Sequence, residues 1–289
     1  MPDQEGTTEN WRNIFRQFFI LSITIISPWL LSACTTSRQH LERLIADTPL
    51  VRGELQANGF RLMTLSKADV IPHAKQVNIY IEGDGRPWIA GGSVVADDPT
   101  PRRPLALSWL TEDSPGALYL GRPCYFVGSD APPCHSGLWT DGRYSEQVVA
   151  TMAAGLAKWQ SAHPDIQRLT LIGYSGGGAL ALLLAERMRA VHRVIAIAAP
   201  LDHQRWTRGH GFSPLFNSLN VADIRSWRND VQRVLVYGEE DRNVTYREFK
   251  DVLPPNAKLI VIPGMPHEQC CGKRGWGDFL ASLPGAEEL

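Results

Sequence analysis

Short apolar runs recur along the chain, and glycine, proline or charged residues bound each of them. Their length and composition are typical of buried strands, which we expect at 77–81, 117–120, 124–127, 169–172, 194–199, 234–237 and 259–262. Segments with helical spacing of apolar residues lie between them, at 105–110, 144–160, 179–185, 246–252 and 276–283. Strands that alternate with helices predict a mostly parallel central sheet with helices on both faces.

The pattern differs ahead of these strands. Extended segments near Glu54 and over 60–65 are separated by Asn58-Gly59, a pair that is typical of a hairpin turn. Further along, the chain between Leu201 and Ile224 is too short for a large separate domain over the sheet. We therefore expect a small lid or none. The sequence contains no internal repeat and no low-complexity segment.

The first stretch of the chain has the pattern of a secretory signal. Arg12 and Arg16 precede an apolar run at 18–31, and small residues follow this run directly before Cys34. Leu31-Ser32-Ala33-Cys34 resembles the lipobox of bacterial lipoproteins. That resemblance implies cleavage before Cys34 and a lipid anchor on this cysteine. The alternative is an uncleaved membrane anchor with an ordinary cysteine.

We therefore divide the chain into a signal peptide (1–33), a tether (34–52) with a short amphipathic helix, and one domain (53–289). Thr35 and Thr36, rather than aspartate, follow the candidate lipidation site. In lipoproteins this indicates sorting to the outer membrane. The expected location is the bacterial cell envelope, with the protein anchored by lipid in the outer membrane and facing the periplasm.

The strand at 169–172 leads directly into Gly173-Tyr174-Ser175-Gly176-Gly177, and an alanine- and leucine-rich helical segment follows. Strand, Gly-x-Ser-x-Gly and helix is the order found in a nucleophile elbow. The residues two before and two after the serine must lack a bulky Cβ, and glycine meets that demand. We therefore expect Ser175 to be a nucleophile. The alternative is a glycine-rich turn that enters a buried helix.

A nucleophilic serine needs a base, and an acid that orients the base, on loops that follow other strands. His267 is the only histidine that follows the last expected strand, where its loop can reach back over Ser175. For the acid we favour Asp241, which follows the strand at 234–237. The alternatives for the acid are Glu239, Glu240 and Asp202.

Acyl transfer also needs two hydrogen-bond donors for the oxyanion. One is expected to be the backbone N–H of Gly176, at the start of the helix that follows the serine. The second should come from the loop after Ile81, where two glycines let the backbone turn its amides inward. We favour the N–H of Asp84, with those of Gly83 and Gly85 as alternatives.

Composition and charge narrow the classes of function. The chain has 289 residues, of which 44% are hydrophobic, and this suffices for one large α/β domain. A formal net charge of −1 without a block of Lys and Arg gives no electrostatic case for nucleic-acid binding. No nucleotide or flavin motif is present, so we expect no cofactor. His267-x-x-Cys270-Cys271 lacks the second ligand pair of a zinc site, so we expect no metal. The sequence does not specify an oligomeric state.

The remaining cysteines are Cys124, Cys134, Cys270 and Cys271. Behind a secretion signal, an even number of cysteines indicates disulfides formed in an oxidising compartment, here with three possible connectivities. We prefer the local pair Cys124–Cys134, which closes a short loop. Cys270 and Cys271 would then be a vicinal pair, and cross-pairing between the two groups stays open.

These residues resemble the α/β-hydrolase superfamily over roughly 56–283. The segment 173–178, the residues Gly238, Asp241 and Val244, and His267 match its three signature loops, and the order serine, acid, histidine is the one found there. More narrowly, several short stretches resemble proteobacterial lipoprotein-type α/β-hydrolases of unassigned substrate. These stretches are 80–85, 122–124, 139–140, 201–203, 206–207 and 218–220. The chain departs from many relatives at Glu82, where they have the histidine of a His-Gly motif.

The motifs and the resemblance together predict an α/β-hydrolase fold and a membrane-tethered serine hydrolase. It would cleave an ester through Ser175, Asp241 and His267, by way of an acyl-enzyme. Peptidase and thioesterase activities use the same triad and stay open. So does a catalytically silent lipoprotein that acts as an envelope binding or assembly factor. The expected partners are a small acyl substrate and a membrane. The candidate pocket residues are Trp88, Trp139, Trp206 and Arg86.

Overall fold

The computed structural model describes residues 37–46, 48–67, 74–113, 116–130, 132–270 and 275–285. The expected signal peptide, the lipidation site Cys34 and Cys271 lie outside the described residues. Among the residues that are described, no helix combines the length and the apolar character needed to cross a bilayer.

Within the described residues, eight strands form one sheet in the order β1-β2-β6-β3-β7-β8-β9-β10. They are β1 (Leu50–Ala57), β2 (Phe60–Lys67), β3 (Gln76–Ile81), β6 (Ala117–Leu120), β7 (Arg168–Tyr174), β8 (Val191–Ile197), β9 (Gln232–Gly238) and β10 (Lys258–Ile262). In the order of the sheet, the six strands β6, β3, β7, β8, β9 and β10 run parallel to one another, whereas β1 and β2 are antiparallel to their neighbours. The expected mostly parallel sheet is confirmed.

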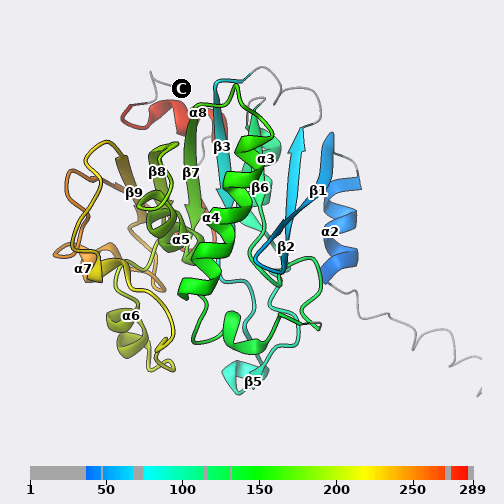
Figure 1. Cartoon of the computed structure of the whole chain (residues 1–289). Coiled ribbons are helices and arrows are strands. Elements are labelled where there is room, and N and C mark those ends of the chain that lie inside the picture. The colour runs from blue at the N-terminus through cyan, green and yellow to red at the C-terminus, as the bar shows by residue number, and fades with distance from the viewer. Residues whose placement is uncertain are drawn as a thin grey trace, which may run out of the picture. The chain divides into compact units, whose positions relative to one another are not determined.

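Helices cover both faces of this sheet (Figure 1). One face carries α4 (Glu146–Ser161) and α5 (Gly176–Ala185), and the other carries α3 (Leu105–Glu112) and α8 (Trp276–Ser282). The other described helical elements are α2 (Ser37–Ala46), α6 (His203–His210), α7 (Tyr246–Phe249) and the 3-10 turns η2 (Ala90–Gly92), η3 (Ser136–Leu138) and η4 (Val221–Asp223). A two-stranded ribbon of β4 (Trp88–Ile89) and β5 (Val94–Val95) follows β3.

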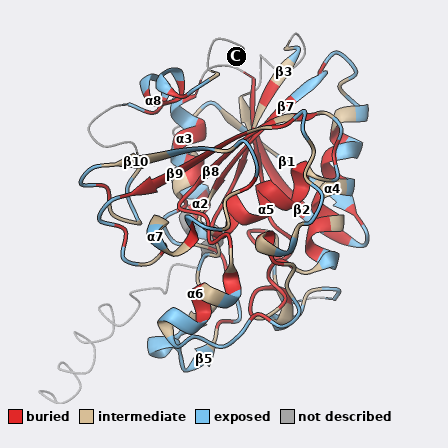
Figure 2. Cartoon of the chain, turned by 90° about the vertical axis from the view of Figure 1, so that its left-hand side faces the viewer, coloured by how far each residue is buried: buried red, intermediate tan, exposed pale blue. Residues whose placement is uncertain are grey.

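Local sequence explains several of these boundaries. Asn58 and Gly59 both have positive φ (49° and 82°) and join β1 to β2, as the hairpin signal predicts. Ser145 caps α4, because its side chain accepts a hydrogen bond from the Val148 N–H. All ten residues of α5 are buried, which explains why this segment is apolar around its whole circumference (Figure 2).

Between β8 and β9 the chain forms only α6 and η4 within the described residues, so the elements that cover the sheet's end are small. The N-terminal boundary of the folded region is earlier than the sequence suggests. Helix α2 is the short amphipathic helix expected in the tether, and its Leu41 is 1% exposed and packs into the core. Strand β1 begins already at Leu50.

The strand expected at 124–127 is wrong. This segment forms turns and bends, and Cys124 and Phe126 have positive φ (72° and 65°), which a strand does not allow. Cys124, Tyr125 and Phe126 are buried nonetheless, so the apolar run reflects burial in an irregular loop. A disulfide joins Cys124 to Cys134, the local pair that we preferred. Cys270 is disulfide-bonded as well.

Candidate active site

Ser175 lies at a sharp turn between β7 and α5, and its backbone is strained (φ 51°, ψ −122°). The turn needs its glycines. A Cβ on Gly173 would lie 2.2 Å from the Gly177 carbonyl oxygen, and one on Gly177 would lie 2.3 Å from the Ile81 carbonyl oxygen. Both distances are far below any normal contact. The local geometry is therefore that of a nucleophile elbow, with the serine at the carboxyl end of a central strand.

His267 and Asp241 meet in the structure. The Nδ1 atom of His267 lies 2.7 Å from Oδ2 of Asp241, whose side chain is fully buried. The other carboxylate oxygen, Oδ1, accepts the N–H groups of Asn243 and Val244, both at 2.8 Å. Three donors thus hold the Asp241 carboxylate, which in turn fixes the orientation and the tautomer of the imidazole.

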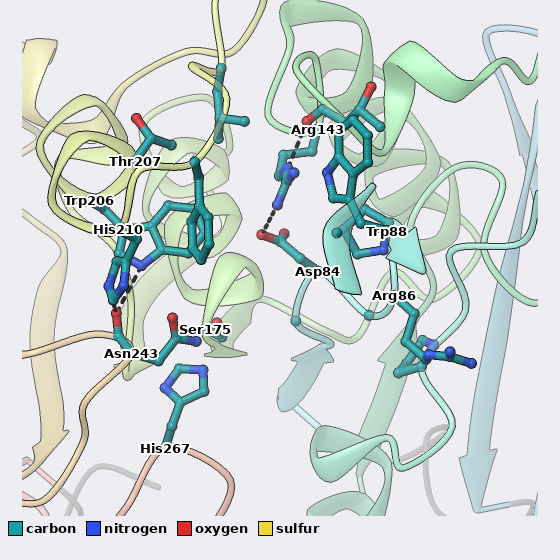
Figure 3. A pocket seen from close by; sticks show the side chains of 18 of the residues that line it. Asp84, Arg86, Trp88, Arg143, Ser175, Trp206, Thr207, His210, Asn243 and His267 are labelled. Carbon is teal, nitrogen blue, oxygen red and sulfur yellow. Dashed lines mark hydrogen bonds and ion pairs between the residues drawn. The ribbon is translucent and has the colours of Figure 1, made fainter. Parts of the chain in front are cut away.

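The loop that carries His267 is held from two sides. The Tyr174 hydroxyl donates to the His267 carbonyl at 3.0 Å. Gly238, at the end of β9, lets the loop pass closely, because a Cβ there would lie 1.9 Å from the Met265 carbonyl oxygen. His267 and Ser175 line the same cavity, and the imidazole points toward the serine (Figure 3). Among the described residues, no hydrogen bond joins Ser175 Oγ to His267, and such contacts often tighten only when substrate binds.

The alternative acids lie elsewhere. Asp202 caps α6, with Oδ1 accepting the N–H groups of Gln204 and Arg205, each at 3.1 Å. Glu239 and Glu240 are exposed. Among the carboxylates considered from the sequence, Asp241 is the one hydrogen-bonded to His267.

The candidate oxyanion donors, which come from the loop after β3 and from the start of α5, differ in their hydrogen bonding. The Gly83 N–H donates to its neighbour Glu82 Oε1 at 3.1 Å, so this amide is already engaged. Within the described part of the chain, the N–H groups of Asp84, Gly85 and Gly176 donate no hydrogen bond. Gly83 packs against Ser175, because a Cβ there would lie 3.4 Å from the Ser175 Cβ. The adjoining Asp84 amide is therefore near the serine as well.

The Asp84 side chain lies in a buried cluster of charges that the sequence analysis missed. Arg122 Nη1 donates to Oδ1 at 2.7 Å, while Arg143 Nη1 and the Tyr144 hydroxyl donate to Oδ2 at 2.9 and 2.7 Å. Burial by itself raises the pKa of Asp84, but Arg143 and Arg122 outweigh it and lower the pKa to about 2. The carboxylate is therefore ionised at neutral pH and packs against Gly176, where a Cβ would lie 2.0 Å from Oδ1.

This cluster also sets the direction of the loop's peptide groups. Arg122 Nη1 donates to the Gly83 carbonyl at 3.2 Å, and the Tyr125 hydroxyl donates to the Asp84 carbonyl at 3.0 Å. The carbonyl of Gly83 and the N–H of Asp84 belong to one trans peptide, so they point in opposite directions. By binding this carbonyl, Arg122 fixes the peptide so that the N–H of Asp84 points away from the guanidinium. Arg122 comes from the loop after β6, which the Cys124–Cys134 disulfide closes.

Glu82 anchors the start of the same loop. It is 2% exposed, and its carboxylate accepts the N–H groups of Gly83 and Ala106, the latter at the first turn of α3. Burial raises the pKa of Glu82 to about 7, although these backbone N–H groups lower it in part. The start of this loop therefore holds a buried carboxyl group whose pKa is raised to about 7.

A cavity of about 1090 Å³ opens beside Ser175. Trp88, Trp206 and Arg86 line it, as the sequence suggests, but Trp139 does not. Trp139 is 3% exposed and donates its indole N–H to the Ala96 carbonyl, so it is a core residue. His210, which no motif in the sequence indicates, also lines the cavity, and its Nε2 lies 2.8 Å from the Asn243 carbonyl oxygen.

No protein-family model and no curated protein matches the sequence. Solved structures do match the fold. The Pyrococcus furiosus esterase Pf2001 superimposes with a TM-score of 0.54 at 16% identity, over 78% of this chain and 85% of that one. A second crystal form of that esterase gives 0.52 at 15% identity, over 78% and 87%. XC6422 from Xanthomonas campestris, described as an a/b serine hydrolase without lid, gives 0.45 at 16% identity, over 76% and 86%. The sheet order, the elbow at Ser175 and the superposition on the Pf2001 esterase together give this chain the α/β-hydrolase fold.

Proposed function

We propose that this protein is a serine hydrolase that cleaves an ester, with Ser175 as nucleophile, His267 as base and Asp241 as the acid that orients the base. The observation that supports this most strongly is the 2.7 Å contact between His267 Nδ1 and the fully buried side chain of Asp241. The imidazole of this histidine points toward Ser175, which lies in a strained elbow. A buried carboxylate with three donors stabilises the imidazolium that forms during acyl transfer.

In the first half of the reaction, His267 Nε2 takes the proton of Ser175 while Oγ attacks the ester carbonyl carbon. The carbonyl oxygen becomes an oxyanion, which the N–H groups of Gly176 and Asp84 bind. The intermediate then collapses. The bond to the alcohol oxygen breaks, the imidazolium gives its proton to that oxygen, and the acyl group stays on Ser175.

In the second half, water replaces the alcohol. His267 takes a proton from water as its oxygen attacks the acyl-enzyme, and the same amides bind the second oxyanion. Collapse releases the acid and returns the proton to Ser175 Oγ. Each step uses groups that this chain itself provides.

The N-terminal sequence supports a further part of the proposal, namely that Cys34 carries a lipid and tethers the hydrolase to the envelope, in the outer membrane on its periplasmic side. A disulfide at Cys124–Cys134 is in keeping with an oxidising compartment. Labelled palmitate should be incorporated into the wild type and not into Cys34→Ser. Incorporation that survives this substitution contradicts the lipid anchor.

The hydrolase proposal is tested with a chromogenic ester such as 4-nitrophenyl butyrate. We expect Ser175→Ala and His267→Ala to abolish turnover, and Asp241→Asn to lower kcat by about 10³- to 10⁴-fold, as loss of a triad acid does elsewhere. Asp202→Asn is the matched control. This change keeps a side-chain oxygen that caps α6, so activity should stay near that of the wild type.

Near wild-type kcat in Asp241→Asn, together with a large loss in Asp202→Asn, would contradict the assigned acid. Turnover of a peptide or a thioester but not of any ester would move the activity to those classes. Folded protein that turns over none of these substrates would favour the silent envelope factor.

A further inference from the structure

Arg143 lines the cavity beside Ser175, although it is only 6% exposed. Its Nε donates to the Thr140 carbonyl at 2.7 Å, and its Nη1 donates to Asp84 Oδ2 at 2.9 Å. The remaining nitrogen, Nη2, donates no hydrogen bond within the described part of the chain, and it is not fully enclosed. Nη2 is thus the nitrogen of this nearly buried guanidinium that has no hydrogen-bond partner among the described residues, and the side chain lines the cavity.

The cluster around Arg143 carries an excess of positive charge. Arg122 and Arg143 share the single carboxylate of Asp84. Tyr144, the third donor to that carboxylate, stays neutral because burial raises its pKa well above the usual value. Arginine remains protonated in proteins, so the cluster has a net charge of +1.

Among the described residues, none of the other carboxylates that line the cavity forms an ion pair with Arg122 or Arg143. Glu82 accepts the N–H groups of Gly83 and Ala106. Asp141 accepts hydrogen bonds from the Asn217 amide and the Thr140 hydroxyl. The third, Glu268, is exposed. A buried charge without a counterion is costly, and an anionic ligand would remove that cost.

The open guanidinium lies close to the reacting serine. Asp84 Oδ1 packs against Gly176, the residue that follows Ser175, and Oδ2 binds Arg143. A single carboxylate group therefore separates Arg143 from the backbone of the nucleophile elbow, and Figure 3 shows the bond between Arg143 and this carboxylate. A group bound at Nη2 would belong to the same small molecule whose carbonyl lies at Ser175.

We propose that Arg143 Nη2 forms a subsite for an anionic group, so that the substrate is an ester that also carries a carboxylate or a phosphate. This inference rests on the proposed hydrolysis at Ser175 and names its substrate class. A planar guanidinium edge donates well to either anion, and a charge-assisted hydrogen bond in a low-dielectric cavity is stronger than a neutral one.

Arg122 provides a matched control. It binds the same Asp84 carboxylate, but it is 1% exposed and does not line the cavity. Replacing either arginine by glutamine removes one partner of Asp84. Only Arg143→Gln also removes the open guanidinium, so a loss of anion preference that is specific to this variant reports the subsite.

The first experiment uses the wild type and needs no variant. We would compare kcat/KM for 4-nitrophenyl butyrate with the values for 4-nitrophenyl hemiesters of malonate, succinate, glutarate and adipate. A second pair, 4-acetoxybenzoate and its methyl ester, places the anion on the alcohol side. The same comparison with esters that carry a phosphate in place of the carboxylate shows which of the two anions the enzyme prefers. We expect one anionic position to exceed its neutral counterpart by about tenfold to a hundredfold.

The second experiment repeats the preferred pair with both variants. In Arg143→Gln the ratio of anionic to neutral kcat/KM should fall by about tenfold or more, while in Arg122→Gln the ratio should stay within about twofold of the wild type. Circular dichroism and urea unfolding establish that the variants are folded. The ratio is internal to each variant, so a general loss of activity does not affect it.

A wild-type ratio at or below one for every anionic ester, with neutral ester hydrolysis that depends on Ser175, overturns the subsite and leaves the hydrolase intact. An equal fall of the ratio in both variants also overturns it, because the effect would then come from the cluster and not from the open guanidinium. Absence of any Ser175-dependent ester hydrolysis overturns the proposed function itself.

Discussion

Replacing Asp84 by asparagine should strongly destabilise the fold, because it removes the only carboxylate shared by Arg122 and Arg143 in the cluster. Asparagine has nearly the same shape but no charge. The native carboxyl has a pKa of about 2, against a usual value of 3.8. The difference corresponds to about 2.5 kcal/mol of folding free energy that ionisation provides. Loss of one partner from a buried ion pair costs about 3 to 5 kcal/mol.

We therefore expect the free energy of unfolding of Asp84→Asn at pH 7 to be lower than that of the wild type by about 2.5 to 5 kcal/mol. Equilibrium urea unfolding, followed by tryptophan fluorescence with the disulfides intact, measures this difference. Asp251→Asn is the control, because Asp251 pairs with Arg205 at the surface and its side chain is 59% exposed. That variant should unfold at nearly the wild-type urea concentration.

The pH dependence has a defined sign. The folded-state pKa of Asp84 is depressed, so its contribution is complete above about pH 4 and is lost as the pH falls toward 2. The gap between wild type and Asp84→Asn should be constant from pH 8 to 5 and should narrow below pH 4. A gap of less than about 1 kcal/mol at pH 7, or an equal loss in Asp251→Asn, would refute the reasoning.

Three further predictions concern the same site. Glu82→Gln removes a carboxyl group whose pKa in the folded state is raised to about 7. As the pH rises from 5 to 8, the free energy of unfolding of the wild type should therefore fall by up to about 3 kcal/mol relative to that of this variant. A difference in urea unfolding that stays constant over this range contradicts the prediction. Gly177→Ala places a Cβ 2.3 Å from a backbone oxygen and should cost about 2 kcal/mol or more, whereas Gly277→Ala, with nothing within 4 Å, should not destabilise; equal effects on the thermal midpoint refute this. Loss of the disulfide in the double variant Cys124→Ala/Cys134→Ala should lower the free energy of unfolding by about 2 to 3 kcal/mol, and an unchanged urea midpoint speaks against it.

The sequence is sufficient to predict a structural feature when the residues that form it lie close together along the chain. The Asn58-Gly59 turn and the glycines around Ser175 each follow from residues a few positions apart. Their backbone requirements leave few alternatives. The pairing of Asp241 with His267 spans 26 residues, but both follow strands of one parallel sheet, whose carboxyl ends meet at one edge.

The cluster around Asp84 could not be predicted in this way. Its members come from the loops after β3 and β6 and from the segment before α4, and no spacing rule links Asp84 to Arg122 and Arg143. The sequence identified Asp84 for its backbone N–H alone. Only the structure shows that its side chain holds the two arginines that position the loop.

Two errors have the same physical origin, which is that burial and regular structure are different properties. The segment 124–127 is apolar because it is buried, yet positive φ at Cys124 makes it a turn. Trp139 is large and aromatic, as pocket residues often are, but its indole N–H is satisfied by the Ala96 carbonyl inside the core. Neither outcome depends on the local hydrophobic pattern.

The central claim is that Ser175 is an activated nucleophile. The most direct test treats the folded protein, with its disulfides intact, with a fluorophosphonate and maps the labelled residue by mass spectrometry, beside Ser175→Ala and His267→Ala. The account predicts labelling at Ser175 alone, no labelling in Ser175→Ala, and a rate of labelling lower by orders of magnitude in His267→Ala. Folded wild-type protein that is not labelled at Ser175, or that is labelled equally fast in His267→Ala, would contradict it.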